Sequence, residues 1–289
     1  SKITHAKSTF FADDTSILIR GHDVNNINIH LRIKETINQL LDWFNQNQLM
    51  INKEKTVVIS FHHIQNKNYE CPSIKLDNHE IQYKQHSKFL GVWLDDNLKW
   101  FTHIQDLSKR LSKLCFALFL VRRVSSLEST RAVYFAYFHS ILKYGIIFWG
   151  NAPYVQLVFK VQKRAIRTMM QVSKATSCKQ LFKDLSILPL PCIYLFETIV
   201  YMKANLNTFS TNSDIHSYDT RHKNNVVINR CNTSLCQQYM DHMGTHMYNC
   251  LPLYLREIPA LSSFKKALFK FLLDHCFYTV NEYFENTKN

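Results

Sequence analysis

The chain has 289 residues, with 35 Lys and Arg against 22 Asp and Glu, which gives a formal net charge of +13. This length allows one large domain or two to three small ones, each able to bury its own core. The excess of positive charge favours a partner with a phosphate backbone and argues against a basic partner. A basic protein without such a partner stays an alternative.

The eight cysteines are scattered along the sequence, and no charged-then-apolar leader opens the chain. We therefore expect a reduced protein of the nucleus or cytoplasm without disulfides. The longest apolar stretches, near 134–149 and 190–201, contain His139, Lys143 or Glu197, which indicates that neither spans a membrane. The Ser1 start and the five glycines are typical of a piece cut from a longer chain.

The first hundred residues predict an α+β unit. Residues 8–12 and 15–20 are rich in aromatic and β-branched side chains and predict a β-hairpin with Asp13 and Asp14 at its tip. From residue 23 to 48 the apolar positions recur every three or four residues, which predicts an amphipathic helix. Further strands are expected at 56–61, 74–76, 80–83 and 88–93.

Beyond residue 100 the pattern changes to helical spacing of apolar residues interleaved with Lys and Arg. Helices are expected at 102–123, 127–149, 156–171, 191–204 and 262–276. Residues 205–230 are rich in Asn, Ser, Thr, Asp and His, a composition that indicates a polar linker. The sequence thus predicts four segments, 1–100, 101–204, 205–230 and 231–289.

The adjacent carboxylates of Asp13 and Asp14 are candidate metal ligands. Mg²⁺ prefers oxygen ligands, and two such ions can stabilise the attacking and leaving oxygens of an in-line phosphoryl transfer. A rigid hairpin that exposes two carboxylates suits this chemistry. The alternative is that Asp-Asp is only favourable turn chemistry, which is also how we interpret Asp95-Asp96-Asn97.

The letters FFADDT at 10–15 resemble the FADD motif of the reverse transcriptases of non-LTR retrotransposons, jockey-like elements in particular. Further stretches resemble the same family in the same order. QLMINKEKT at 48–56 matches at Asn52, Lys55 and Thr56, with Gln48 in place of a glycine, and KFLGVWLD at 88–95 is similar to the primer grip. Others are at 142–150, 218–223 and 248–252.

This resemblance implies a partial polymerase palm of hairpin, helix and small sheet, followed by a helical thumb and a mostly helical tail. It implies an RNA-directed DNA polymerase that uses Mg²⁺, deoxynucleoside triphosphates, an RNA template and a DNA primer, with no membrane partner. Asp13 and Asp14 would bind the metal, and Lys55 would protonate the pyrophosphate leaving group. Phe89, Leu90 and Gly91 would hold the primer. Alternatively, Lys55 is a solvated charge, and Phe89 and Leu90 belong to the core.

A family polymerase also needs fingers and a third catalytic Asp upstream of FADD, and only twelve residues precede Asp13. We therefore expect the C-terminal half of such an enzyme, inactive alone. The alternatives are a non-catalytic nucleic-acid-binding relic and a helical scaffold without nucleic-acid affinity.

The basic residues of the helical region are candidates for sequence-independent phosphate contacts. One group lies in the first of these helices and the other falls along one face of a later helix: Lys113, Arg122 and Arg123, then Lys160, Lys163, Arg164 and Arg167. An ordinary solvated face is the alternative. Cys231, Cys236, His242 and His246 have a C-x4-C-x5-H-x3-H spacing, but the central gap is far shorter than the roughly twelve residues of a ββα finger, so we do not expect zinc.

Overall fold

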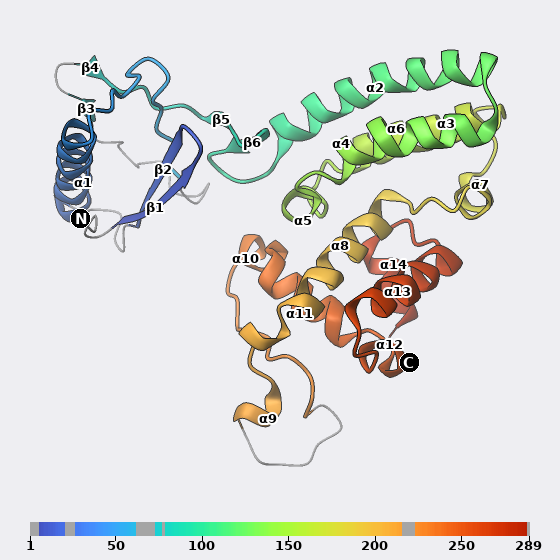
Figure 1. Cartoon of the computed structure of the whole chain (residues 1–289). Helices are drawn as coiled ribbons and strands as arrows, with labels where there is room; N and C mark the ends of the chain where they lie inside the picture. Colours follow the sequence, from blue (N-terminus) through green and yellow to red (C-terminus); the bar gives the residue numbers. More distant parts are fainter. Residues whose placement is uncertain (1–5, 21–26, 62–72, 77–78, 216–222, 288–289) are drawn as a thin grey trace. The chain divides into compact units, whose positions relative to one another are not determined.

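The computed structural model describes residues 6–20, 27–61, 73–76, 79–215 and 223–287. It divides into two compact units, Ser1–Leu98 and Lys99–Asn289, each with its own hydrophobic core. The fold is α+β, mostly helical with small antiparallel sheets, as the sequence predicts (Figure 1). The assignment of palm, thumb, linker and tail to 1–100, 101–204, 205–230 and 231–289 stays a prediction.

The first unit opens with the predicted hairpin. Strands β1 (Ala6–Phe11) and β2 (Asp14–Ile19) pair antiparallel, with Phe11 opposite Asp14. The two turn residues are therefore Ala12 and Asp13, and Ala12 has a φ of 52°. The turn lies one residue earlier than predicted, because Asp14 already belongs to the second strand.

Helix α1 (Ile27–Gln46) carries the core of this unit, within the predicted range of 23–48. Its Ile33, Ile37 and Leu41 pack against Ile74, Leu76 and Ile81. The last three belong to or flank the short paired strands β3 (Lys75–Leu76) and β4 (His79–Glu80).

Three strand predictions in this unit are wrong. The segment 80–83 is in a strand only at Glu80, the last residue of β4, and Tyr83 makes a single bridge. Among the described residues the segment 56–61 forms one parallel bridge, Val58 to Tyr83, and no described strand pairs with the rest of it. The segment 88–93 is a hairpin of β5 (His86–Phe89) and β6 (Val92–Asp95). Leu90 and Gly91 form its turn with φ of 45° and 83°, and two positive φ values in a two-residue loop define a tight hairpin turn. Asp95 ends β6 and a turn follows, as predicted.

The second unit is helical. Its helices are α2 (Phe101–Val124), α3 (Leu127–Val133), the π-helix η1 (Tyr134–His139), α4 (Ser140–Lys143), α5 (Ile146–Trp149), α6 (Gln156–Met170), α7 (Cys178–Asp184), α8 (Leu190–Ala204), the 3-10 helix η2 (Leu206–Thr208), α9 (Asn212–Ile215), α10 (Ser234–Gln238), α11 (Met240–Asn249), α12 (Leu253–Arg256), α13 (Leu261–His275) and α14 (Val280–Asn286). The predicted single helix at 127–149 is wrong: Tyr144 is extended and Gly145 has a φ of 63°, which separates α4 from α5.

Helices α2 and α6 run parallel and side by side. The Cys115 thiol of α2 donates to the Val161 carbonyl of α6 at 3.6 Å, and two turns further along both helices Arg122 Nε donates to the Met169 carbonyl at 2.9 Å. Helix α8 is the buried helix of the unit, in contact with α5, α11, α13 and α14 (Figure 1).

The described parts of 205–230 are attached to the second unit. Backbone bonds join its two ends, from Val227 N to the Ser210 carbonyl at 2.9 Å and from Asn212 N to the Asn225 carbonyl at 3.0 Å. The side chain of Val226 is buried in the core of the unit. Residues 216–222 lie outside the described residues.

Candidate functional site

The acid pair lies at an exposed end of the β1–β2 hairpin. The side chains of Asp13 and Asp14 are both exposed, and so is Phe11. The hairpin contacts α1 through the rings of Phe10 and Trp43, whose centroids are 5.8 Å apart. A two-residue turn on paired strands therefore presents two carboxylates to solvent on a well-defined backbone, and carboxylate oxygens are the ligands that Mg²⁺ prefers.

The described residues supply only two carboxylates at this end. In the part of the chain that the structure describes, no three His, Cys, Asp or Glu side chains lie close enough together to hold a metal ion. Asp13 and Asp14 thus fit a hard divalent cation in ligand type and are an incomplete ligand set in number.

Lys55 belongs to a turn built by its neighbour Asn52. The Asn52 side-chain oxygen accepts from Lys55 N at 3.1 Å, and the Asn52 carbonyl accepts from Thr56 N and Thr56 Oγ1 at 3.0 and 2.8 Å. The Lys55 side chain is exposed. Asn52 and Thr56 of the family-like segment therefore shape the turn, and Lys55 is the residue of the three that points its charged group to solvent.

The predicted primer-holding residues form the end of the β5–β6 hairpin. Phe89 is 37% exposed and Gly91 is exposed, while Leu90 is partly buried. Phe89 therefore does not belong to the core. It is the last residue of β5 and lies next to the tight turn.

Replacing Gly91 with alanine is expected to destabilise this hairpin by about 1 kcal/mol or more, because a Cβ is unfavourable at a φ of 83°. Amide hydrogen exchange of residues 86–95 should become faster. Leu90 gives a matched control, since its φ is also positive: Leu90→Gly relieves strain there, so it should leave exchange unchanged or slow it. Equal acceleration in both variants would contradict the expectation.

The seven basic residues of α2 and α6 that are predicted to contact phosphates divide into two groups. Three are bound by their own chain: Arg122 donates to the Met169 and Ser125 carbonyls, Arg167 donates to the Thr176 carbonyl at 2.8 Å, and Lys163 lies over the ring of Phe159 at 4.6 Å. The other four side chains are exposed: Lys113, Arg123, Lys160 and Arg164. The exposed group is the one able to contact phosphates.

The outer side of α2 also exposes apolar side chains that the sequence analysis did not single out. Phe116, Phe119 and Val124 are 64%, 46% and 84% exposed, and the two phenylalanine rings stack with centroids 6.4 Å apart. Arg123 lies over the Phe119 ring at 5.9 Å. The sequence could have revealed this surface, because Phe116, Phe119 and Val124 fall, like Lys113 and Arg123, at positions outside the buried stripe of α2.

The family-like stretch at 142–150 has a folding role. The buried indole of Trp149 donates to the Tyr144 carbonyl at 3.1 Å and closes the bend between α4 and α5. A Cβ on Gly150 would lie 2.5 Å from the Tyr194 ring and 2.6 Å from the Ile146 carbonyl.

Gly150→Ala is therefore expected to lower the free energy of unfolding of the second unit by about 1–3 kcal/mol through overpacking. Urea unfolding followed by circular dichroism measures it. Gly150→Ala in a Tyr194→Leu background should cost less than in the native background, because the clashing ring is gone. Equal costs in both backgrounds would show that the contact with Tyr194 is not responsible.

The stretch at 248–252 also stabilises the fold. Asn249 of α11 accepts from Val226 N at 2.9 Å and donates to the Val226 carbonyl at 2.8 Å, so one side chain satisfies both backbone groups of a buried residue. Tyr218 to His222 of the other tail stretch lie outside the described residues.

Asn249→Ala is expected to cost about 1–3 kcal/mol of stability, because both backbone groups of Val226 lose their partner in a buried place. Asn249→Asp keeps the acceptor and loses the donor, so it should lower the free energy of unfolding at neutral pH. This loss should become smaller in acid, where the protonated carboxyl can donate again. Thermal unfolding at neutral and acidic pH compares the two variants. No loss in either one would rule out this anchoring role.

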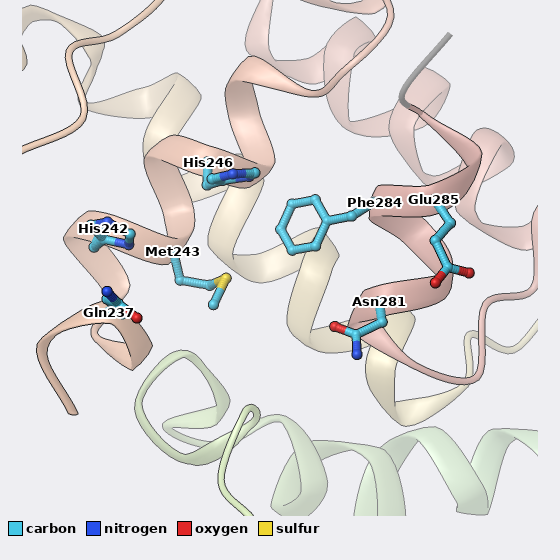
Figure 2. Close-up of a pocket in the computed structure, with 7 residues that line it drawn as sticks. All are labelled: Gln237, His242, Met243, His246, Asn281, Phe284 and Glu285. Carbon is cyan, nitrogen blue, oxygen red and sulfur yellow. The ribbon is translucent and has the colours of Figure 1, made fainter. Parts of the chain in front are cut away.

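The four residues of the zinc-like spacing separate into two pairs. His242 and His246 of α11 line a pocket of about 370 Å³ with Gln237 of α10 and with residues of α14 (Figure 2). The rest of the lining is Met243, Asn281, Phe284 and Glu285. The His246 and Phe284 rings pack edge to face with their centroids 4.7 Å apart. Cys250 Sγ lies 3.6 Å from His246 Nδ1. The two remaining cysteines contact each other and do not line the pocket.

No family model matches the chain, and no solved structure matches it significantly. Over 168 residues the chain is 25% identical to the RNA-directed DNA polymerase from mobile element jockey of Drosophila melanogaster. The chain is distantly related to a reverse transcriptase. The aligned region covers 57% of this chain and 18% of the jockey protein. In the described residues no helix is both long and apolar enough to cross a membrane.

Proposed function

We propose that this chain is part of a non-LTR retrotransposon reverse transcriptase, in which its first unit completes the palm and its second unit supplies the thumb and tail. The exposed acid pair at the β1–β2 turn carries the proposal, because both carboxylates of the FADD-like motif lie at the end of the hairpin and are exposed to solvent. The similarity to the jockey polymerase supports it.

In this proposal Asp13 and Asp14 would hold the Mg²⁺ that the reaction of a primer 3′ end with a deoxynucleoside triphosphate requires. Bound Mg²⁺ would neutralise phosphate charge and stabilise the attacking and leaving oxygens. Lys55 donates a proton to the pyrophosphate leaving group, for which its exposed ammonium is suited. Asp13 and Asp14 are two ligands, and the resemblance implies a third from a segment upstream of the FADD motif, so polymerisation is expected to depend on that segment.

The β5–β6 hairpin holds the primer strand in this scheme. Its tight turn at Leu90 and Gly91 fixes the direction of the half-exposed Phe89. The exposed Lys113, Lys160 and Arg164 neutralise backbone phosphates of a template–primer duplex without reading its sequence.

Primer extension tests the catalytic proposal. The chain alone and the chain preceded by the fingers and first palm strand of a jockey-like polymerase are given an RNA template, a DNA primer, Mg²⁺ and deoxynucleotides. Elongation by the extended chain alone supports the proposal. If the extended chain folds and binds duplex without elongating the primer, the catalytic proposal is wrong.

The second candidate function is nucleic-acid binding without catalysis, which the exposed cations of α2 and α6 favour. Duplex binding by this chain should weaken steeply with salt. Changing Lys113, Lys160 and Arg164 to Glu should lower the salt slope by about 1 per lost phosphate contact. The same changes at the exposed Lys265, Lys266 and Lys270 of α13 alter the net charge equally and provide the control. Equal effects of both triple variants would exclude a specific role for the α2 and α6 cations.

A further inference from the structure

Six of the seven cysteines of the second unit fall into two chemical groups, and the seventh, Cys250, is partly exposed beside His246. Cys115, Cys178, Cys192 and Cys276 are buried, and each thiol donates to a backbone carbonyl, at distances of 3.4 to 3.7 Å. Burial raises the pKa of each of these four thiols. A thiol that is buried and holds its proton reacts slowly, because the thiolate is the nucleophile.

Cys231 and Cys236 differ from these four cysteines in exposure. They are partly exposed, and the Cys231 thiol is hydrogen-bonded to the Cys236 sulfur, so the two sulfur atoms are neighbours. This hydrogen bond raises the pKa of Cys231, with smaller effects of burial and of the charge of Cys236. The pair thus combines access to solvent with the proximity that a disulfide requires.

The backbone around the pair keeps the two residues close. Thr233 begins α10, and its Oγ1 accepts from Cys236 N at 3.2 Å. Gln237 of the same helix donates from Nε2 to the Cys231 carbonyl at 3.2 Å. The chain therefore folds back from Cys231 to the first turn of α10, and Gln237 links this fold to the pocket that it lines.

We propose that Cys231 and Cys236 are a reversible dithiol site, which a low-molecular-weight disulfide such as oxidised glutathione converts to an intramolecular disulfide. One protein thiolate attacks the oxidant, which forms a mixed disulfide and releases one glutathione thiolate. The second protein thiol, as its thiolate, then attacks the mixed disulfide, the protein S–S bond forms and a second glutathione leaves. The two cysteines lose two protons and two electrons, and the glutathione disulfide gains them as two thiols.

The disulfide would tie the end of the 205–230 segment to α10 beside the pocket. In the reduced form the hydrogen bonds of Thr233 and Gln237 and the weak bond between the two sulfur atoms hold this point. Thiol reductants reverse the tie, so it responds to the redox state of its surroundings.

Mass spectrometry of the full chain tests this site. The folded chain is incubated with oxidised glutathione, alkylated and digested with trypsin, which releases residues 231–256 as one peptide because no Lys or Arg lies between Arg230 and Arg256. This peptide contains Cys231, Cys236 and Cys250. The expected product has lost two hydrogens and carries one alkyl group, on Cys250, whereas the four buried cysteines are unmodified by glutathione.

Two variants sharpen the result. Cys250→Ser should keep the loss of two hydrogens, and Cys231→Ser should abolish it and leave glutathione attached to Cys236. The proposal is overturned if the folded chain gives no such disulfide while the chain in urea does. It is equally overturned if Cys250 replaces either member of the pair, or if both cysteines carry glutathione without closing the ring.

Discussion

Replacing Gln162 with leucine is expected to lower the free energy of unfolding of the second unit by about 3 kcal/mol or more. The Gln162 side chain is completely buried in α6. Its Nε2 donates to the Tyr134 hydroxyl at 3.1 Å and to the Leu188 carbonyl at 3.0 Å, and its Oε1 accepts from Leu190 N at 2.7 Å. Leucine fills similar space and leaves a hydroxyl, a carbonyl and an N–H without these partners, each at a cost of about 1–3 kcal/mol.

The effect should be large because these bonds join three separate elements. Tyr134 begins η1, and Leu188 and Leu190 are the residues at which the chain enters α8, the buried helix of the unit. Urea unfolding followed by circular dichroism measures the change. Gln180→Ala is the control, because Gln180 is exposed and bonds Asp184 at 2.8 Å within its own helix, so it should stay within about 0.5 kcal/mol of the native chain. A Gln162 variant as stable as this control would contradict the prediction.

The long helices could be predicted from the sequence to within one residue. Expected spans of 102–123, 191–204 and 262–276 correspond to α2, α8 and α13. Each has enough turns for the 3.6-residue period of its apolar positions to be unambiguous. The hairpin at 8–20 could be predicted for a similar reason, since Asp is favourable in a turn between two strongly β-forming runs.

The wrong secondary-structure predictions share a cause. The spacing of apolar residues in a sequence does not show where the backbone bends or which distant segments pair with it. The bend at Gly145 interrupts an apolar pattern that continues across it, so 127–149 reads as one helix. The strand at 56–61 has the right composition, but only Val58 finds a neighbouring backbone. In 88–93 the positive φ values of Leu90 and Gly91 turn an expected strand into a hairpin.

The candidate site likewise has features that the sequence predicts and features that only the structure shows. The residue types of the acid pair and of the basic helices were readable from the sequence. Which cations stay exposed was not, because the partners of Arg122 and Lys163 are Met169 and Tyr278, far along the chain. The spacing that places Lys160, Lys163, Arg164 and Arg167 on one helix face does not show that two of them bind their own fold.

The family-like stretches do not all have the same meaning. Gly91, Gly150 and Asn249 act on the backbone or the packing of this chain, through a positive φ, a close ring contact and a two-bond anchor. Their match to the family pattern therefore supports a shared fold. Asp13 and Asp14 are different, because both are exposed and neither is needed to complete the β1–β2 ladder beyond Asp14 opposite Phe11. The catalytic proposal therefore depends on these two carboxylates rather than on the residues that stabilise the fold.

The second large effect follows from this contrast. In a chain extended by the upstream fingers and palm strand, Asp13→Asn and Asp14→Asn are each expected to slow nucleotide incorporation on the order of a thousandfold, about 4 kcal/mol in barrier height. An amide has nearly the shape of a carboxylate and lacks its charge, so the hairpin persists while Mg²⁺ binding is lost. Single-nucleotide incorporation at saturating template–primer measures the rate, and duplex affinity should be unchanged.

Asp42→Asn is the matched control, because Asp42 is an exposed carboxylate on α1 of the same unit and lies away from the turn in sequence. It removes the same charge and should leave the rate within a few-fold of the native one. Equal rates for Asp13→Asn, Asp14→Asn and Asp42→Asn would mean that the acid pair is turn chemistry after all. In that case the exposed cations of α2 and α6 would be left as the functional surface of the chain, and binding without catalysis would become its activity.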